Sequence, residues 1–278
     1  MNLTQLKTLW REHDFRPNKK LGQNFLIDNN VRDNILKNLP VAENDTLIEI
    51  GPGFGVMTFE AARLCGKLYA VEKDEKICSI MKPFYEKSAN IELICKDVLD
   101  VEISSFSKEG GKILILGNLP YYITTPIIEK IIENKKLIRN AYVVVQDELA
   151  DRIVASPGSR VFGSITCFIQ FHANVKKLFK IKKNSFYPRP KVDSCLLAIE
   201  VLEEPSVSVK DEKLMFDVIH KCFSQRRKKI INPLSHTNFL GFDRDKWNEI
   251  ITSCGIDPSS RAEQLSLKDY AKITNTIS

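Results

Sequence analysis

The feature that most constrains the fold is a regular alternation of short apolar runs with amphipathic stretches, which begins at residue 46. Five runs have the length of buried strands: 46–50, 67–71, 91–95, 113–116 and 141–145. Three stretches between them have helical spacing: 56–65, 74–87 and 125–134. Gly66 stands where a glycine would close the first helix. This alternation predicts βαβ units and a parallel sheet covered on both faces, as in Rossmann-like α/β folds.

The alternation does not continue to the end of the chain. Residues 192–201 have the pattern of one more strand, and the polar, proline-containing sequence 203–206 follows them. Beyond it, helical spacing without any strand pattern occurs in three segments: 211–223, 245–254 and 267–274. We therefore predict an α/β domain over residues 1–204, of which 1–28 form an N-terminal extension, and a smaller all-helical C-terminal domain over 205–278.

Composition and cysteine usage exclude several classes of protein. The 278 residues are 43% apolar and 27% charged, which excludes collagen-like, mucin-like and largely disordered chains. The seven cysteines are odd in number, scattered and never spaced as Cys-x-x-Cys, which argues against a disulfide framework and a zinc site. The first 15 residues lack the apolar core of a signal peptide, and no run reaches 18 apolar residues. We expect a soluble, cytoplasmic monomer with neither a metal nor a membrane segment.

A glycine-rich loop, Glu49-Ile50-Gly51-Pro52-Gly53-Phe54-Gly55, follows the first predicted strand and leads directly into a helix. Glycine permits a tight turn and lets the backbone lie against a ligand. The dinucleotide fingerprint G-x-G-x-x-G/A would place its third small residue at position 56, where this chain has Val56. The spacing G-x-G-x-G, with an acid two residues before the first glycine, is instead typical of S-adenosylmethionine sites.

Two carboxylates follow the next two predicted strands. Glu72 ends the second strand about 20 residues after the glycines, where a Rossmann-type fold places the acid that accepts the ribose hydroxyls. Asp97 follows the third strand, where it can accept a hydrogen bond from an adenine amino group. Each feature alone could be a turn or a cap, but ligands bind at the carboxyl ends of parallel strands. The loop and both acids therefore predict one cofactor site.

The tetrapeptide Asn118-Leu119-Pro120-Tyr121 follows the fourth predicted strand. The exocyclic amine of adenine is a poor nucleophile because its lone pair is delocalised into the ring. If the Asn118 side-chain oxygen and the Pro120 carbonyl each accept one N–H, the lone pair turns toward a methyl donor. Tyr121 would stack on the base once it is extruded. Asn-x-Pro is also a common turn, but its place after the fourth strand favours the catalytic interpretation.

These motifs resemble the rRNA adenine N6,N6-dimethyltransferases, and the resemblance extends from about Lys19 to Leu234. Further matching segments are residues 20–26, 146–152, 156–159, 186–194 and 223–228. The resemblance implies a class I methyltransferase domain, S-adenosylmethionine as cofactor, and transfer of four methyl groups to two adjacent adenosines near the 3′ end of 16S rRNA in the immature small ribosomal subunit. It also implies a set of cofactor-binding residues: Asn24, Leu26, Gly51, Gly53, Glu72, Asp97 and Asn118. Phe186 should close the opposite face of the target adenine.

The sequence departs from the family pattern at two places. After Pro157-Gly158 the family usually has Tyr-Gly-Arg or a similar sequence, whereas this chain has Phe162-Gly163-Ser164. Asp147 follows Gln146 at a position where the family usually has a lysine. Both departures affect the expected contacts with RNA and leave the catalytic residues in place.

Basic residues are concentrated in two segments. Residues 176–191 contain seven lysines and arginines and no acid, and residues 221–230 contain five and no acid. Together they carry +12, which leaves −6 for the rest of a chain whose net charge is +6. Aromatic residues interleave with the first segment, which suits a surface that binds phosphates and stacks bases, although a lysine run can also be only a solvated face. The predicted RNA-binding residues are Lys19, Lys20, Arg189, Lys191, Arg226, Arg227, Lys228 and Lys229.

Two other classes of function remain open at this point. One is an adenine N6-methyltransferase for large-subunit rRNA, as in the erythromycin-resistance enzymes, or for DNA, because such enzymes share the glycine loop and the logic of the tetrapeptide. The other is a non-catalytic protein of this fold, such as an rRNA-binding assembly factor or a transcription factor. The intact Glu72, Asp97 and tetrapeptide argue against the non-catalytic alternative.

Overall fold

The computed structural model describes residues 3–107 and 112–278, apart from the side chains of Lys19 and Thr237. The chain divides into two compact units. One contains the chain up to Ala150 together with Asn174–Glu203, and the other contains Asp151–Ala173 together with Glu204–Ser278.

The composition of these units differs from the predicted domains at one place. The sequence pattern assigns residues 151–173 to the α/β domain, whereas in the structure they cluster with the C-terminal helices. The reason is apolar packing, because Cys167 and Phe171 are buried in the same core as Met215 and Ile219. The chain therefore crosses between the units more than once, and its last crossing lies between residues 203 and 204.

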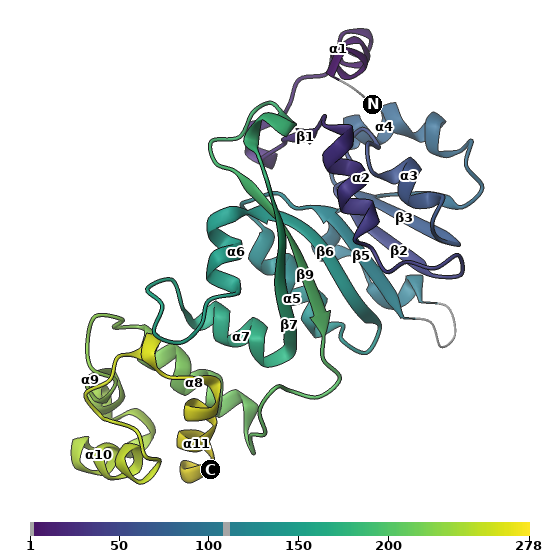
Figure 1. The fold of residues 1–278 in the computed structure, drawn as a ribbon. Coiled ribbons are helices and arrows are strands. Elements are labelled where there is room, and N and C mark those ends of the chain that lie inside the picture. The colour runs from purple at the N-terminus through teal and green to yellow at the C-terminus, as the bar shows by residue number, and fades with distance from the viewer. Residues whose placement is uncertain (1–2, 108–111) are drawn as a thin grey trace. The chain divides into compact units, whose positions relative to one another are not determined.

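The first unit is built around a seven-stranded sheet within the described residues (Figure 1). Its strands are β2 (Thr46–Ile50), β3 (Lys67–Glu72), β4 (Ile91–Cys95), β5 (Ile113–Asn118), β6 (Ile138–Gln146), β7 (Ala173–Ile181) and β9 (Ser194–Val201). They lie in the order β4-β3-β2-β5-β6-β9-β7. Strands β2 to β6 pair in parallel, and β9 is antiparallel to β6. The predicted Rossmann-like sheet is confirmed.

Strand β7 has no counterpart among the predicted strands. Its sequence contains Lys176, Lys177 and Lys180, so its pattern predicts a basic segment and no strand. An edge position explains why such a sequence can form a strand, because an edge strand exposes much of its surface to water and tolerates lysine well.

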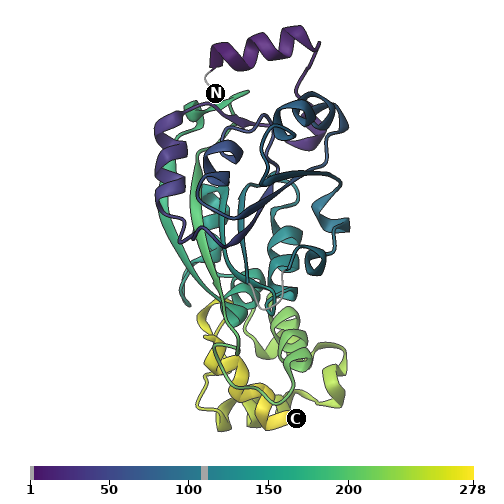
Figure 2. The ribbon, with the colours of Figure 1, turned by 90° about the vertical axis from the view of Figure 1, so that its right-hand side faces the viewer.

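Helices cover both faces of the sheet, with α2 and α5 on opposite faces (Figures 1 and 2). The helices of this unit are α2 (Asn29–Lys37), α3 (Thr58–Ala62), α4 (Glu75–Tyr85) and α5 (Thr124–Glu133), with short 3-10 helices η2 (Val98–Asp100), η3 (Ile103–Phe106) and η4 (Lys183–Ser185). Helix α6 (Asp147–Ile153) begins in this unit and continues past Ala150 into the second. Helix α4 begins where the Asp74 carboxylate accepts the N–H groups of Lys76 and Ile77. The prediction that Gly66 closes the first helix is wrong, because α3 already ends at Ala62.

The N-terminal segment packs behind the glycine loop. It comprises α1 (Leu3–Glu12), η1 (Lys19–Leu21) and β1 (Phe25–Leu26), and β1 pairs antiparallel with β8 (Phe186–Tyr187). The rings of Trp10, Phe15, Phe25, Phe54 and Tyr187 form one cluster, with centroids of neighbouring rings 5.0–6.1 Å apart. Because Phe54 belongs to the glycine loop, this cluster connects the loop to the extension.

Among its described residues, the second unit is built mainly of helices joined by turns and loops. Its helices are α7 (Ser164–His172), α8 (Glu212–Phe223), α9 (Ile231–Ser235), α10 (Arg244–Ser253) and α11 (Leu267–Ile277), with 3-10 helices η5 (His236–Gly241) and η6 (Ala262–Gln264). The buried Trp247 and Tyr270 contribute to its core, and the Tyr270 hydroxyl donates a hydrogen bond to the Ala262 carbonyl. None of the helices in the described part of the chain is long and apolar enough to span a membrane.

Candidate active site

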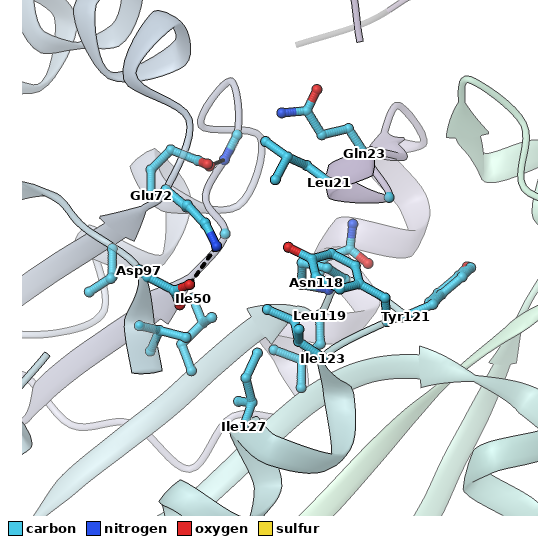
Figure 3. A pocket seen from close by; sticks show the side chains of 18 of the residues that line it. Leu21, Gln23, Ile50, Glu72, Asp97, Asn118, Leu119, Tyr121, Ile123 and Ile127 are labelled. Carbon is cyan, nitrogen blue, oxygen red and sulfur yellow. Dashed lines mark hydrogen bonds and ion pairs between the residues drawn. The ribbon is translucent and has the colours of Figure 1, made fainter. Parts of the chain in front are cut away.

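A pocket with about 760 Å³ of empty space lies at the carboxyl ends of β2, β3, β4 and β5 (Figure 3). This is the edge where parallel α/β sheets bind ligands. Most of the predicted cofactor and catalytic residues line it: Asn24, Gly51, Gly53, Glu72, Asp97, Asn118, Pro120 and Tyr121. Glu72 and Asp97 lie on one side of the pocket and Asn118 on the other, and the Tyr121 ring extends away from the two acids. The fold thus brings together side chains that are up to 97 residues apart in sequence.

The glycine loop has a conformation that requires glycine. Gly51, Gly53 and Gly55 have φ angles of +68°, +53° and +73°, which L side chains rarely adopt. A Cβ atom on Gly53 would lie 2.8 Å from the Phe25 ring, so the loop also depends on close contact with β1. The result is a stretch of bare backbone along one wall of the pocket, where a cofactor can lie against the chain.

Glu72 is held by the backbone on both sides of its carboxylate. Its Oε2 atom accepts the Gly53 N–H at 3.1 Å, and its Oε1 atom accepts the Asp74 N–H at 2.9 Å. Burial raises the pKa of Glu72, and these two hydrogen bonds oppose the rise. Each oxygen keeps a lone pair for a further donor, so the carboxylate is preformed to accept a pair of hydroxyl groups.

Asp97 is paired with a lysine that the sequence motifs did not single out. Lys73 Nζ lies 2.6 Å from Asp97 Oδ2, and Oδ1 accepts the Leu99 N–H at 3.0 Å (Figure 3). Burial alone would raise the pKa of Asp97, but the hydrogen bonds from Lys73 and Leu99 outweigh it and hold the pKa below its usual value. Asp97 is therefore a charged acceptor in the pocket at neutral pH.

Glu49, the acid of the glycine motif, is fully buried in β2. Neither of its carboxylate oxygens has a hydrogen-bond partner in the parts of the chain that the structure describes. Burial raises the pKa of Glu49 to about 7, against the opposing effect of the nearby Thr58 hydroxyl, and the charge of Glu72 adds to the rise. Near neutral pH this carboxyl group therefore titrates beneath the cofactor loop.

The tetrapeptide offers two oxygen atoms to the pocket. Asn118 Nδ2 donates to the Asn24 carbonyl at 2.9 Å, which leaves Oδ1 as the free end of the amide. The Pro120 carbonyl already accepts two hydrogen bonds, from the Ile123 N–H at 3.2 Å and the Thr124 hydroxyl at 3.0 Å. Within the described residues, nothing donates to the Leu119 carbonyl. The turn into α5 thus occupies both lone pairs of the Pro120 carbonyl, which the sequence analysis assigned to the target amine, and leaves the Leu119 carbonyl as the alternative acceptor.

Tyr121 lines the pocket with its hydroxyl anchored, because its oxygen lies 2.8 Å from Ser194 Oγ. Burial raises the pKa of the Tyr121 hydroxyl, so it remains neutral. Leu26 and Phe186, in contrast, do not line the pocket. The pairing of β1 with β8 places them opposite each other, and both side chains are buried in the core. In this structure they support the pocket from behind.

Several lining residues were not among the predicted site residues. Leu21, Gly22, Gln23 and Phe25 belong to the matching segment 20–26, whereas Lys73, Lys96 and Tyr122 lie outside the motifs and directly follow motif residues or precede them. Their positions next to strand ends were the available signal. Gln23 Nε2 also donates to Asp74 Oδ2 at 2.7 Å, which ties the extension to the first turn of α4.

The predicted RNA-binding residues of the first unit differ in their surroundings. Lys20, Arg189 and Lys191 are exposed, and no side-chain partner occurs for them in the described structure. The side chain of Lys19 lies outside the described residues. Other lysines of segment 176–191 are paired with acids that come from elsewhere in the chain.

In the second unit, Arg227, Lys228 and Lys229 are exposed. Arg226 instead has a structural role, because its Nη2 atom donates to the carbonyls of Arg160 at 2.9 Å and Phe162 at 2.7 Å. Its guanidinium is therefore occupied in holding the segment before α7. Of the four basic residues predicted here, the other three are available to bind phosphates.

Comparisons with known proteins agree on one family. The sequence model of the family described as "Ribosomal RNA adenine dimethylase" matches residues 14–278. The protein named ribosomal RNA small subunit methyltransferase A from Clostridium botulinum is 36% identical over 271 residues, which cover 98% of each chain. Its namesake from Bacillus mycoides is 37% identical over 277 residues, which cover 98% of this chain and 94% of the relative.

Solved structures show the same fold. A dimethyladenosine transferase from Plasmodium falciparum superposes with a TM-score of 0.77 at 23% identity, over 90% of this chain and 95% of that one. A 23S rRNA methyltransferase, ErmE, superposes with a TM-score of 0.71 at 20% identity, over 91% of this chain and 99% of that one. At these identities the likeness extends to the fold and does not distinguish between substrates.

Proposed function

The chain belongs to the ribosomal RNA adenine dimethylase family, and from this premise we propose that it dimethylates the N6 atoms of two adjacent adenosines near the 3′ end of 16S rRNA in the immature small ribosomal subunit. It is an S-adenosylmethionine-dependent rRNA adenine dimethyltransferase. The observation that carries the proposal is the tetrapeptide on the opposite side of one pocket from Glu72 and Asp97. We further propose that it acts in the cytoplasm as a monomer.

The pocket residues fit the cofactor. S-adenosylmethionine supplies an electrophilic methyl group on a sulfonium sulfur. We assign Glu72 to its ribose hydroxyls, because the carboxylate is fixed by two N–H groups and retains lone pairs. Asp97 is a charged acceptor at the next strand end and suits the adenine amino group. Gly51 and Gly53 provide the bare backbone beside them, and Asn24 holds Asn118 in place.

The target amine is held by two oxygen atoms of the chain in this mechanism. Asn118 Oδ1 accepts one N–H, and the Leu119 carbonyl, which replaces the Pro120 carbonyl of the sequence prediction, accepts the other. These contacts turn the nitrogen lone pair toward the methyl donor and stabilise the positive charge that develops on nitrogen. Because both acceptors are neutral and in place before the base binds, orientation and electrostatics carry the rate enhancement.

Tyr121 holds the extruded base in the proposed complex. Its hydroxyl is fixed by Ser194, so the ring has one edge anchored and can offer a face to the adenine. Phe186 is buried and belongs to β8, which pairs with β1. Tyr122, which lines the pocket and is 50% exposed, is the additional aromatic side chain available to the base.

The second methyl transfer places a different demand on the two acceptors. After the first transfer only one N–H remains, so Asn118 Oδ1 and the Leu119 carbonyl cannot both be satisfied. The pocket must then accommodate a methyl group beside one of them. Substitutions that affect only one acceptor should therefore change the ratio of monomethylated to dimethylated product.

We favour small-subunit rRNA over large-subunit rRNA as the substrate, because relatives at 36–37% identity over nearly the full chain are named small-subunit methyltransferases. The test is incubation with labelled S-adenosylmethionine and undermethylated small subunits, or large subunits, followed by mapping of the modified adenosines. We expect label at two adjacent adenosines near the 3′ end of the small-subunit rRNA. Label in large-subunit rRNA alone would show a substrate of the erythromycin-resistance type, and RNA binding without label would show a non-catalytic factor.

A further inference from the structure

The basic strand β7 and the turn after it carry an internal network of counter-ions. Asp147 accepts two lysines, with its carboxylate oxygens 2.8 Å from Lys177 Nζ and 2.8 Å from Lys180 Nζ. Asp193 Oδ2 lies 3.3 Å from Lys180 Nζ and 3.6 Å from Lys182 Nζ. These lysines belong to a segment that contains no acid of its own. The fold therefore supplies both carboxylates from outside the segment.

The backbone fixes the two carboxylates side by side. Asp147 begins α6 directly after β6, and its N–H donates to the Asp193 carbonyl at 3.1 Å. Asp193 Oδ1 in turn accepts the Lys183 N–H at 3.0 Å. The acidic side chains are only 19% and 21% exposed, whereas Lys180 is 48% exposed. The acids are thus built into the fold, and the ammonium groups above them face solvent.

Both acids are charged at neutral pH. Burial would raise the pKa of Asp147, but the hydrogen bonds from Lys177 and Lys180 outweigh it and hold the pKa below its usual value. The Lys183 N–H, followed by Lys180, lowers the pKa of Asp193. The geometry and the charges therefore agree that Lys180 is neutralised by two fixed carboxylates.

The network lies beside the pocket. Ser194, which holds the Tyr121 hydroxyl, directly follows Asp193. Gln146 pairs with Ser194 across β6 and β9 and directly precedes Asp147. Asp147 and Asp193 are therefore each one residue along the chain from a pair of residues that lies beside Tyr121.

We propose that Asp147 and Asp193 determine RNA selectivity by preventing Lys180 and its neighbours from binding phosphates of any sequence. This inference rests on the proposed function, because it takes RNA as the ligand. An unpaired lysine binds phosphates regardless of base identity, and each such contact adds non-specific affinity. Neutralisation by built-in carboxylates removes that contribution at the pocket. The exposed Lys20, Arg189 and Lys191 remain for productive phosphate contacts.

The test is a double variant, Asp147→Asn with Asp193→Asn, which keeps one acceptor oxygen in each side chain and removes both charges. Its affinity for a single-stranded RNA that lacks the target sequence is measured between 50 and 200 mM KCl. We expect tighter binding and a log–log salt slope steeper by about 0.7 per phosphate gained. For one contact the ratio of affinities at the two salt concentrations grows about 2.6-fold.

Lys180→Met sharpens the test. In the double variant it should reverse the change in slope, whereas in the wild-type protein it should change the slope little, because Lys180 is already paired there. The matched control is Glu43→Gln with Glu133→Gln, which changes net charge equally. Both glutamates are exposed and have no ion pair in the described structure. An equal slope in the double variant and this control would overturn the proposal.

Folding and the proposed function are checked separately. Binding of S-adenosylhomocysteine and thermal unfolding report whether each variant is folded, and single Asp147→Asn is the alternative if the double variant is not. For the single variant we expect the salt slope of RNA affinity to steepen by a smaller amount. An unchanged slope in a folded single variant would contradict the proposal. Failure of the wild-type protein to label small-subunit rRNA would refute the proposed function, whereas the salt slopes test the counter-ions independently.

Discussion

The two ends of the pocket are built on different electrostatic principles. At the glycine-loop end, the polar groups are the carboxylates of Glu72 and Asp97, with Glu49 buried beneath the loop, and burial or pairing shifts the pKa of each of the three. At the tetrapeptide end, the polar groups are a neutral amide and a hydroxyl that remains protonated, from Asn118 and Tyr121, together with backbone carbonyls. Cofactor binding should therefore vary with pH and salt, whereas the groups that hold the target amine should affect the rate at any pH.

Asn118→Ala tests the tetrapeptide end and has the largest expected effect. It removes one of two acceptors that stabilise developing charge, so the rate of methyl transfer should fall by about 10²–10³-fold. Affinity for S-adenosylhomocysteine, measured by calorimetry, should fall by less than about tenfold. Asn38→Ala is the control, because Asn38 Nδ2 also donates to a backbone carbonyl but on the surface. Normal dimethylation by Asn118→Ala would refute the mechanism.

Glu49→Gln tests whether the carboxyl group buried beneath the cofactor loop titrates near neutral pH. The pKa of Glu49 rises from 4.5 to about 7 on folding, which corresponds to about 3 kcal/mol. Between these values the folded protein holds a proton that the unfolded chain has lost, so its free energy of unfolding falls as pH rises. This decrease in the free energy of unfolding begins above pH 4.5 and is complete above pH 7. It should be absent in Glu49→Gln.

Urea unfolding at pH 5 and pH 8 measures this difference. Relative to the wild-type protein, Glu49→Gln should become more stable by up to about 3 kcal/mol over this interval. Glu133→Gln, an exposed carboxylate, should show no such change. A difference between Glu49→Gln and wild type that does not vary with pH would contradict a buried, titrating Glu49.

Gly53→Ala tests the shape of the cofactor end. The added Cβ would lie 2.8 Å from the Phe25 ring, at a φ of +53° that costs L residues about 1–2 kcal/mol. Displacement of the loop would also move the N–H that Glu72 accepts. Affinity for S-adenosylhomocysteine should fall at least about tenfold, or 1.4 kcal/mol. Gly255→Ala has a similar φ of +73° with open space around it, so it should lower stability but leave cofactor affinity unchanged.

Lys73→Met should have the smallest effect. Without Lys73, the pKa of Asp97 rises, because burial is then opposed mainly by the Leu99 N–H. A carboxyl whose pKa is lowered on folding contributes stability above its unfolded pKa and loses it as pH falls through the folded value. The variant should lose affinity for S-adenosylhomocysteine at a higher pH than wild type does in titrations from pH 4 to 7. Lys82→Met, which removes an exposed lysine of α4, should match wild type.

The sequence was sufficient to predict the sheet and most of the pocket. Apolar runs and helical spacing are local patterns, and five parallel strands follow directly from them. Because ligands bind at the carboxyl ends of such strands, the sequence alone predicts that Glu72, Asp97 and Asn118 share one site. The glycine loop was recognisable for the same reason, since its φ angles require glycine.

The sequence does not show which hydrogen-bond acceptors of the site are already occupied. Whether the Leu119 or the Pro120 carbonyl is free depends on which donors the turn into α5 presents, and Thr124 is one of them. The burial of Leu26 and Phe186 likewise follows from the pairing of two short strands about 160 residues apart. Residues 151–173 join the helical unit because of apolar contacts with helices much later in the chain.

Local sequence patterns are enough to predict the fold class, the order of the strands along the chain and the residue types at their ends, because periodicity and strand-end position are properties of nearby residues. Which charges and carbonyls are available depends on the folded arrangement of distant segments. Segment 176–191 has no acid in its sequence, yet Asp147 and Asp193 neutralise its central lysines. Coulomb energy depends on distance in space, and the sequence does not contain that distance.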